Sequence, residues 1–104
     1  MFSIKNKLEQ IVHKIKTNYK PEKIILFGSH SEGKGQRDSD IDLLVIKDTD
    51  STPWVRAEEI DHYIQHIVPI DILVYTPKEI EERLQINDFF VKDIMEKGSV
   101  LYER

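Results

Sequence analysis

The chain has 104 residues and a formal net charge of −4, with 39% hydrophobic and 33% charged residues. This length and balance exclude a multidomain enzyme and a disordered chain, so we expect one folded domain over 1–104. The lack of cysteine excludes disulfides, thiolate metal sites and a cysteine nucleophile. No leader pattern or long apolar run is present, which predicts a cytoplasmic protein that does not enter a membrane.

The first elements in chain order are expected to be a helix and two buried strands. Apolar residues recur at helical spacing from Ile4 to Ile15, which predicts an amphipathic helix of about four turns. A short apolar run over 23–27 ends at Gly28, as is typical of a buried strand followed by a tight turn. A second apolar run predicts another strand over 41–46.

The rest of the chain continues the alternation of helices and strands. The further expected elements are a helix from Pro53, a strand over 70–75, a helix from Pro77, a helix after Asn87 and an edge strand over 99–102. Thr76 and Glu79 match a capping box before the third helix. Strands separated by helices predict an α/β (α+β) fold, with a short mixed β-sheet flanked by helices. Three aromatic side chains are expected in the core or in contact with a partner: Trp54, Phe89 and Phe90.

A glycine-rich segment follows the first expected strand. Three of the four glycines lie between positions 28 and 35. Backbone N–H groups in such a turn approach an anion closely, so the segment is interpreted as a phosphate-binding loop. Its candidate nucleotide-binding residues are Gly28, Ser29, Gly33 and Lys34.

Three carboxylates lie at or near the beginnings of two expected strands. Asp40 and Asp42 stand two residues apart, so period-two geometry places both on one face. A charge in a buried strand is unfavourable unless it is compensated, and Mg²⁺ prefers carboxylate oxygens. The alternative is that Asp38 and Asp40 end a turn while Asp42 reaches solvent. Asp71 repeats the pattern, and the three carboxylates would suffice for two Mg²⁺ ions if the two strands are neighbours.

These residues resemble a known family. Gly28-Ser29, ten intervening residues and Asp40-Ile41-Asp42 resemble the signature of the DNA polymerase β-like nucleotidyltransferases, and the whole chain is similar to their minimal (MNT) subfamily. The resemblance implies a single nucleotidyltransferase-type domain in which Asp40, Asp42 and Asp71 are catalytic and bind two Mg²⁺ ions, with Mn²⁺ as a substitute. The implied reaction transfers a nucleoside monophosphate, AMP from ATP or its counterpart from another NTP, to a hydroxyl of a macromolecule.

The resemblance also implies a partner. MNT-like proteins pair with helical HEPN proteins, so this chain would be the antitoxin that adds AMP to its partner, in a hetero-oligomer or as a homodimer. Two alternatives stay open. Glu32, where family members carry Arg or Lys, favours a degenerate module that acts by contact alone. Transfer to RNA draws on the basic segment 1–37, which has 8 Lys and Arg against 3 acidic residues.

Overall fold

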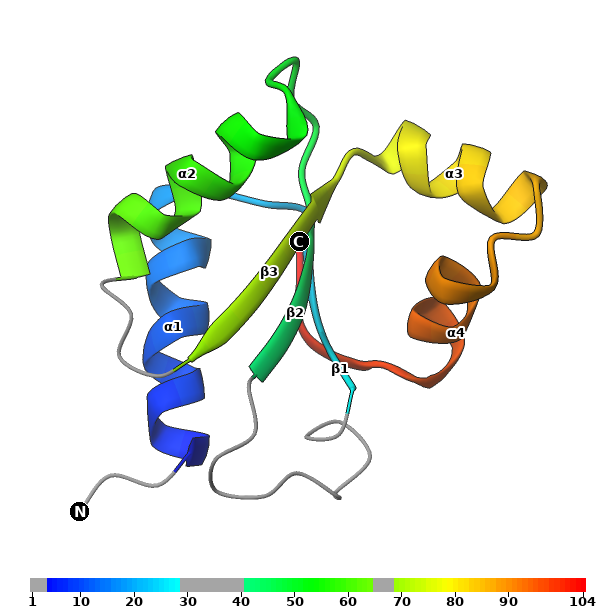
Figure 1. The fold of residues 1–104 in the computed structure, drawn as a ribbon. Coiled ribbons are helices and arrows are strands. Elements are labelled where there is room, and N and C mark those ends of the chain that lie inside the picture. Colours follow the sequence, from blue (N-terminus) through cyan, green and yellow to red (C-terminus); the bar gives the residue numbers. More distant parts are fainter. Residues whose placement is uncertain (1–3, 29–40, 65–68) are drawn as a thin grey trace.

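The computed structural model describes residues 4–28, 41–64 and 69–104. Within these ranges a four-stranded mixed sheet lies between two pairs of helices (Figure 1). The helices are α1 (Ile4–Asn18), α2 (Pro53–Ile64), α3 (Pro77–Gln85) and α4 (Phe89–Lys97). The strands are β1 (Lys23–Phe27), β2 (Ile41–Ile46), β3 (Ile70–Tyr75) and β4 (Ser99–Glu103). The predicted fold class is therefore confirmed.

The sheet has the strand order β3-β2-β1-β4. β1 pairs antiparallel with both β2 and β4, while β2 pairs parallel with β3. β4 lies at the edge, as predicted, and extends one residue beyond the expected range, to Glu103. The condition left open by the sequence, that the strands over 41–46 and 70–75 are neighbours, is met, and this pairing determines where their carboxylates meet.

Side chains alternate along the strands and divide the core between the two faces of the sheet. On one face, strand residues such as Ile24 and Leu43 pack against Ile11 of α1 and Ile60 of α2. On the other face, Ile25, Leu44 and Ile46 pack against Ile80 of α3 and against Val91 and Ile94 of α4. None of the helices in the described ranges is long and apolar enough to span a membrane.

The ends of α3 and α4 are defined by local signals. The capping box is confirmed: the N–H of Glu79 donates to Oγ1 of Thr76 at 3.1 Å, and the N–H of Thr76 donates to Oε1 of Glu79 at 2.8 Å. Asn87, between the two helices, has a left-handed φ of 58°. Gly98 ends α4, as predicted, and a Cβ there would lie 2.5 Å from Cγ2 of Ile25. The lack of a side chain therefore lets the end of α4 approach β1.

The expectation that Trp54, Phe89 and Phe90 belong to the core is wrong. Their side chains are 72%, 83% and 51% exposed, respectively. The inward face of α2 is set by Arg56, which is 5% exposed, and by the apolar residues one and two turns beyond it. Trp54 lies about 200° around the helix from Arg56 and so points outward, as does Phe89 relative to the buried Val91. Contact with a partner stays a prediction for these aromatic residues.

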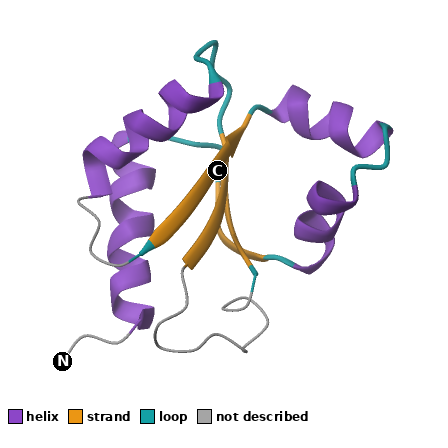
Figure 2. Cartoon of the chain, viewed as in Figure 1, coloured by secondary structure: helices purple, strands orange, loops and turns teal. Residues whose placement is uncertain are grey.

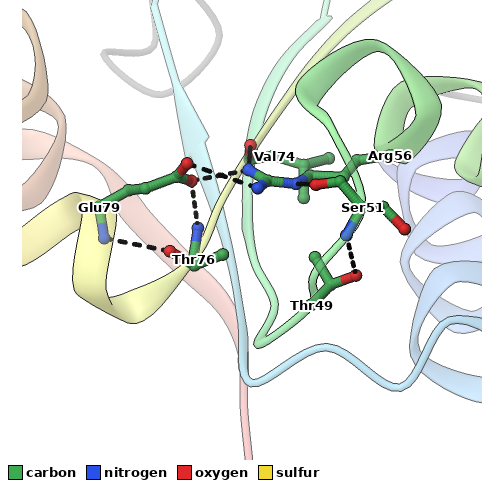
Figure 3. Close-up of polar contacts among 6 residues, drawn as sticks. All are labelled: Thr49, Ser51, Arg56, Val74, Thr76 and Glu79. Carbon is green, nitrogen blue, oxygen red and sulfur yellow. Dashed lines mark hydrogen bonds and ion pairs between the residues drawn. The ribbon is translucent and has the colours of Figure 1, made fainter.

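Buried Arg56 connects three parts of the fold (Figure 3). Its Nε donates to the carbonyl of Ser51 at 2.6 Å, and its Nη1 donates to the carbonyl of Val74 at 3.2 Å. The same Nη1 forms an ion pair with Oε1 of Glu79 at 2.6 Å. The guanidinium thus ties the segment before α2 to the end of β3 and to the first turn of α3, which lies on the other face of the sheet. Sequence reasoning missed this contact.

Candidate active site

Two of the predicted carboxylates lie opposite each other in the sheet. The parallel register of β2 and β3 pairs Asp42 with Asp71, and the antiparallel register of β1 and β2 pairs Phe27 with Asp42. Paired residues on neighbouring strands point to the same face, here the face covered by α3 and α4. Phe27, Asp42 and Asp71 therefore form a row across the three strands. This row lies where β1 ends and where β2 and β3 begin, at the lower end of the sheet in Figure 2.

The surroundings of the two carboxylates differ. Asp42 is half-buried between Ile41 and Leu43, both of which are fully buried, whereas Asp71 is exposed. Like charges placed directly opposite each other in a sheet are destabilising. Partial burial of one of them adds a desolvation penalty. Two carboxylates paired in this way present negative charge to a positively charged ligand such as a metal ion.

Gly28 brings the start of the glycine-rich segment against Asp42. Its φ is +77°, a conformation that residues with a side chain rarely adopt. A Cβ at this position would lie 2.5 Å from Oδ2 of Asp42. The backbone can approach the carboxylate this closely only because the residue is glycine. The structure therefore brings together three of the predicted site residues: Gly28, Asp42 and Asp71.

The other predicted site residues lie outside the described residues. They are Ser29, Gly33, Lys34 and Asp40, and Glu32 belongs to the same stretch. Across 4–28, 41–64 and 69–104, no three side chains of His, Asp or Glu gather closely enough to hold a metal ion. The donor chemistry of Asp42 and Asp71 nevertheless fits Mg²⁺, which takes carboxylate oxygens from the protein together with oxygens of phosphate and water.

A pocket next to Gly28 was not predicted from the sequence. It has a volume of about 240 Å³ and lies between the end of β1 and α4. Its walls include Phe27, Gly28, Phe90 and Ile94, together with the ion pair between Asp93 and Lys97. The rings of Phe27 and Phe90 meet edge to face, with their centroids 5.7 Å apart. The helical pattern marks Phe90 only as a possible core residue, and no local signal places α4 against the glycine turn.

A mixed sheet that presents opposed carboxylates beside a glycine turn is the arrangement expected of an enzyme that transfers nucleotidyl groups. The family model described as "Nucleotidyltransferase domain" matches residues 8–101. The chain belongs to this family, and its features fit the minimal nucleotidyltransferases. It is a nucleotidyltransferase.

Two relatives come from Methanocaldococcus jannaschii. "Putative protein adenylyltransferase MJ0604" is 32% identical over 99 residues, an alignment that covers 91% of this chain and 94% of the relative. "Putative protein adenylyltransferase MJ1215" is 30% identical over 77 residues and covers 74% of this chain and 88% of the relative. Both alignments include most of the two proteins compared.

Solved structures share the fold. A "putative nucleotidyltransferase" from Sulfolobus solfataricus superimposes with a TM-score of 0.68 at 20% identity, covering 94% of this chain and 78% of that chain. A chain from a toxin-antitoxin structure with AMP-PNP gives a TM-score of 0.61 at 21% identity, covering 98% of this chain and 75% of that chain. At these identities the likeness concerns the arrangement of helices and strands.

Proposed function

We propose that this chain is a Mg²⁺-dependent protein adenylyltransferase that moves AMP from ATP to a hydroxyl on a partner protein in the cytoplasm. The observation that carries the proposal is the pairing of Asp42 with Asp71 beside Gly28. The names of the Methanocaldococcus relatives support protein as the acceptor and AMP as the transferred group. The domain proposed to do this spans 1–104.

The reaction places distinct demands on the carboxylates and on the glycine-rich segment. An acceptor oxygen bonds to the α-phosphorus of ATP, the bond from that phosphorus to the bridging oxygen breaks, and pyrophosphate leaves while the acceptor loses its proton. In the proposal, Asp40 and Asp42 hold Mg²⁺, and the exposed Asp71 completes the site on the acceptor side. Bound Mg²⁺ would supply neutralisation of phosphate charge and activation of the hydroxyl. Gly28, Ser29, Gly33 and Lys34 would hold the triphosphate.

The proposed partner is a toxin of the helical HEPN type, with this chain acting as the antitoxin. The toxin-antitoxin structure among the fold neighbours supports a toxin as the partner. The HEPN class comes from the family resemblance. The protein encoded by the gene next to the one for this chain is the first candidate for the acceptor.

The test is transfer of label from α-labelled ATP to the purified candidate partner in the presence of Mg²⁺. We expect wild type to label the partner and Asp42→Asn to lower the rate by about 100-fold or more, because the substitution removes a charged oxygen from the reacting centre. Asp48→Asn is the matched control, because Asp48 is exposed and lies after β2, and this variant should transfer at the wild-type rate. Undiminished transfer by Asp42→Asn would overturn the proposal.

A further inference from the structure

The pocket between β1 and α4 shares a wall with the carboxylate site. Gly28 lines the pocket and also lies against Oδ2 of Asp42, so the two spaces meet at this residue. Phe27, the residue paired with Asp42 across the sheet, lines the pocket as well. A ligand whose charged end binds at the carboxylates and the glycine turn can therefore extend an uncharged end into the pocket.

From this placement we infer that the pocket is the subsite for the base of the nucleotide substrate. The inference rests on the proposed function, which supplies a nucleotide at the adjacent carboxylates. The volume of about 240 Å³ lies below the range of about 300 to 1,000 Å³ typical of pockets for drug-sized ligands. The space thus suits one flat ring system and is too small for a whole nucleotide.

The lining fits a flat, weakly polar ring. Phe90 is half-exposed, and its edge-to-face contact with Phe27 fixes the ring at the pocket wall. Ile94, one turn further along α4, adds an apolar surface that is itself anchored in the core. Bases stack on aromatic side chains, and the loss of such a ring weakens binding by about tenfold or more.

The polar edge of a base would meet the ion pair on α4. Nζ of Lys97 lies 3.1 Å from Oδ1 of Asp93, one helical turn earlier, and both residues line the pocket. Their side chains are 67% and 53% exposed, and an ion pair this exposed contributes little to stability. Exchanging part of it for contacts with a base therefore costs little. The carboxylate accepts from an amino or ring N–H group, and the ammonium donates to a ring nitrogen or a carbonyl oxygen.

The test compares two ligands that share phosphates but differ in the base. Binding of AMP-PNP and of tripolyphosphate, each with Mg²⁺, is measured by calorimetry. Phe90→Ala should weaken AMP-PNP about tenfold and leave tripolyphosphate unchanged. Phe89→Ala is the matched control, because this neighbouring ring is 83% exposed and lies outside the pocket lining. Thermal unfolding confirms that each variant is folded.

A second pair of variants tests the polar edge independently of the aromatic ring. Lys97→Gln should change the ratio of the affinities for AMP-PNP and GMP-PNP by several-fold, because a side chain that contacts the base affects the two bases differently. Lys92→Gln, an exposed lysine of the same helix, should leave the ratio unchanged. A purely structural role for Lys97 would weaken both ligands equally.

Each remaining outcome separates this inference from the proposed function. If wild type binds AMP-PNP and labels the partner while Phe90→Ala and Lys97→Gln bind like wild type, the inference alone is wrong. If these variants raise the KM for the partner with nucleotide affinity unchanged, the pocket receives the acceptor, and the base subsite is refuted. If wild type neither binds AMP-PNP nor transfers label, the proposed function and the inference fail together.

Discussion

Gly28 is the single residue on which the geometry of the carboxylate site depends most directly. A methyl group there would meet Oδ2 of Asp42 at 2.5 Å, and the φ of +77° disfavours any residue with a side chain. We expect Gly28→Ala to lose most label transfer, because the carboxylate must move, while stability falls by only about 1 to 2 kcal/mol. Transfer rates and urea unfolding of the same preparations measure the two effects.

The variant Gly28→Asn separates the effect of backbone strain at position 28 from the effect of a Cβ that contacts Asp42. Asparagine adopts left-handed backbone conformations more readily than alanine, yet its Cβ would occupy the same place. If the contact with Asp42 decides activity, both variants lose transfer. Recovery of wild-type transfer by Gly28→Asn would show instead that backbone conformation alone decides it.

Tyr19 has a buried hydroxyl group without a hydrogen-bond partner among the described residues. Burial, followed by the negative charge of Glu59, raises the pKa of Tyr19 to about 12. We expect Tyr19→Phe to stabilise the protein by about 1 kcal/mol, because it removes an unsatisfied polar group and keeps the ring beneath Nζ of Lys47. Urea unfolding measures the change, and a loss of stability would reveal a partner for the hydroxyl.

At the scale of elements, the ion pair between Arg56 and Glu79 links α2 to α3 and makes stability depend on pH. Burial raises the pKa of Glu79, but hydrogen bonds from Arg56 and from the backbone of Thr76, together with the charge of Arg56, outweigh burial and lower the pKa below its ordinary value. The stabilisation is therefore fully present above the ordinary glutamate pKa of about 4.3 and is lost as the pH falls through the lower folded-state pKa.

Glu79→Gln should remove this pH dependence. At about pH 7 we expect the variant to unfold more easily than wild type by about 1 kcal/mol or less, since the Glu79 side chain is 34% exposed. The difference should narrow as the pH falls below the ordinary glutamate pKa and through the lower folded-state pKa, because wild-type Glu79 then becomes protonated. Glu81→Gln, an exposed substitution in the same helix, is the control. A difference that stays constant over the whole pH range would contradict the assignment.

The bounds of helices and strands could be predicted where they depend on neighbouring residues in the sequence. The partners of side chains that connect distant elements could not be predicted. The strands over 23–27, 41–46 and 70–75 were predicted with the observed bounds, because each is a short apolar run that ends at a turn or a cap. The capping box of α3 is likewise encoded within four residues. Arg56 could not be placed from sequence, because its partners lie 5, 18 and 23 residues away.

At the scale of the whole molecule, the site depends on strand order, which the sequence left conditional. Asp42 and Asp71 could be singled out as charges in apolar strands, but their convergence required β2 and β3 to be neighbours. The pocket beside these carboxylates could not be predicted from the sequence. It forms only because α4 packs against β1, and that packing depends on the close approach at Gly98. Local patterns thus identify candidate ligands, whereas the shape around them arises from packing between distant elements.

Because the carboxylates can be replaced without changing the packing around them, the transfer reaction can be tested separately from partner binding. In the variant that combines Asp42→Asn with Asp71→Asn, the sheet and its helices should remain folded, because asparagine keeps the size and shape of both side chains. Apart from the exposed Asp71, its outer surface is unchanged, including the exposed rings of Trp54 and Phe89. Partner binding should therefore persist while label transfer is lost.

Whether the double variant still suppresses the toxicity of the partner then distinguishes action by AMP transfer from action by contact alone. If it acts by transferring AMP, cells that express the partner with the double variant should grow as poorly as cells that express the partner alone, even though pull-down shows the complex intact. A degenerate module that acts by contact alone would instead protect these cells as well as wild type does. Because the variant alters only the two carboxylates, growth measured together with pull-down assigns the protective effect either to the reaction or to the surface.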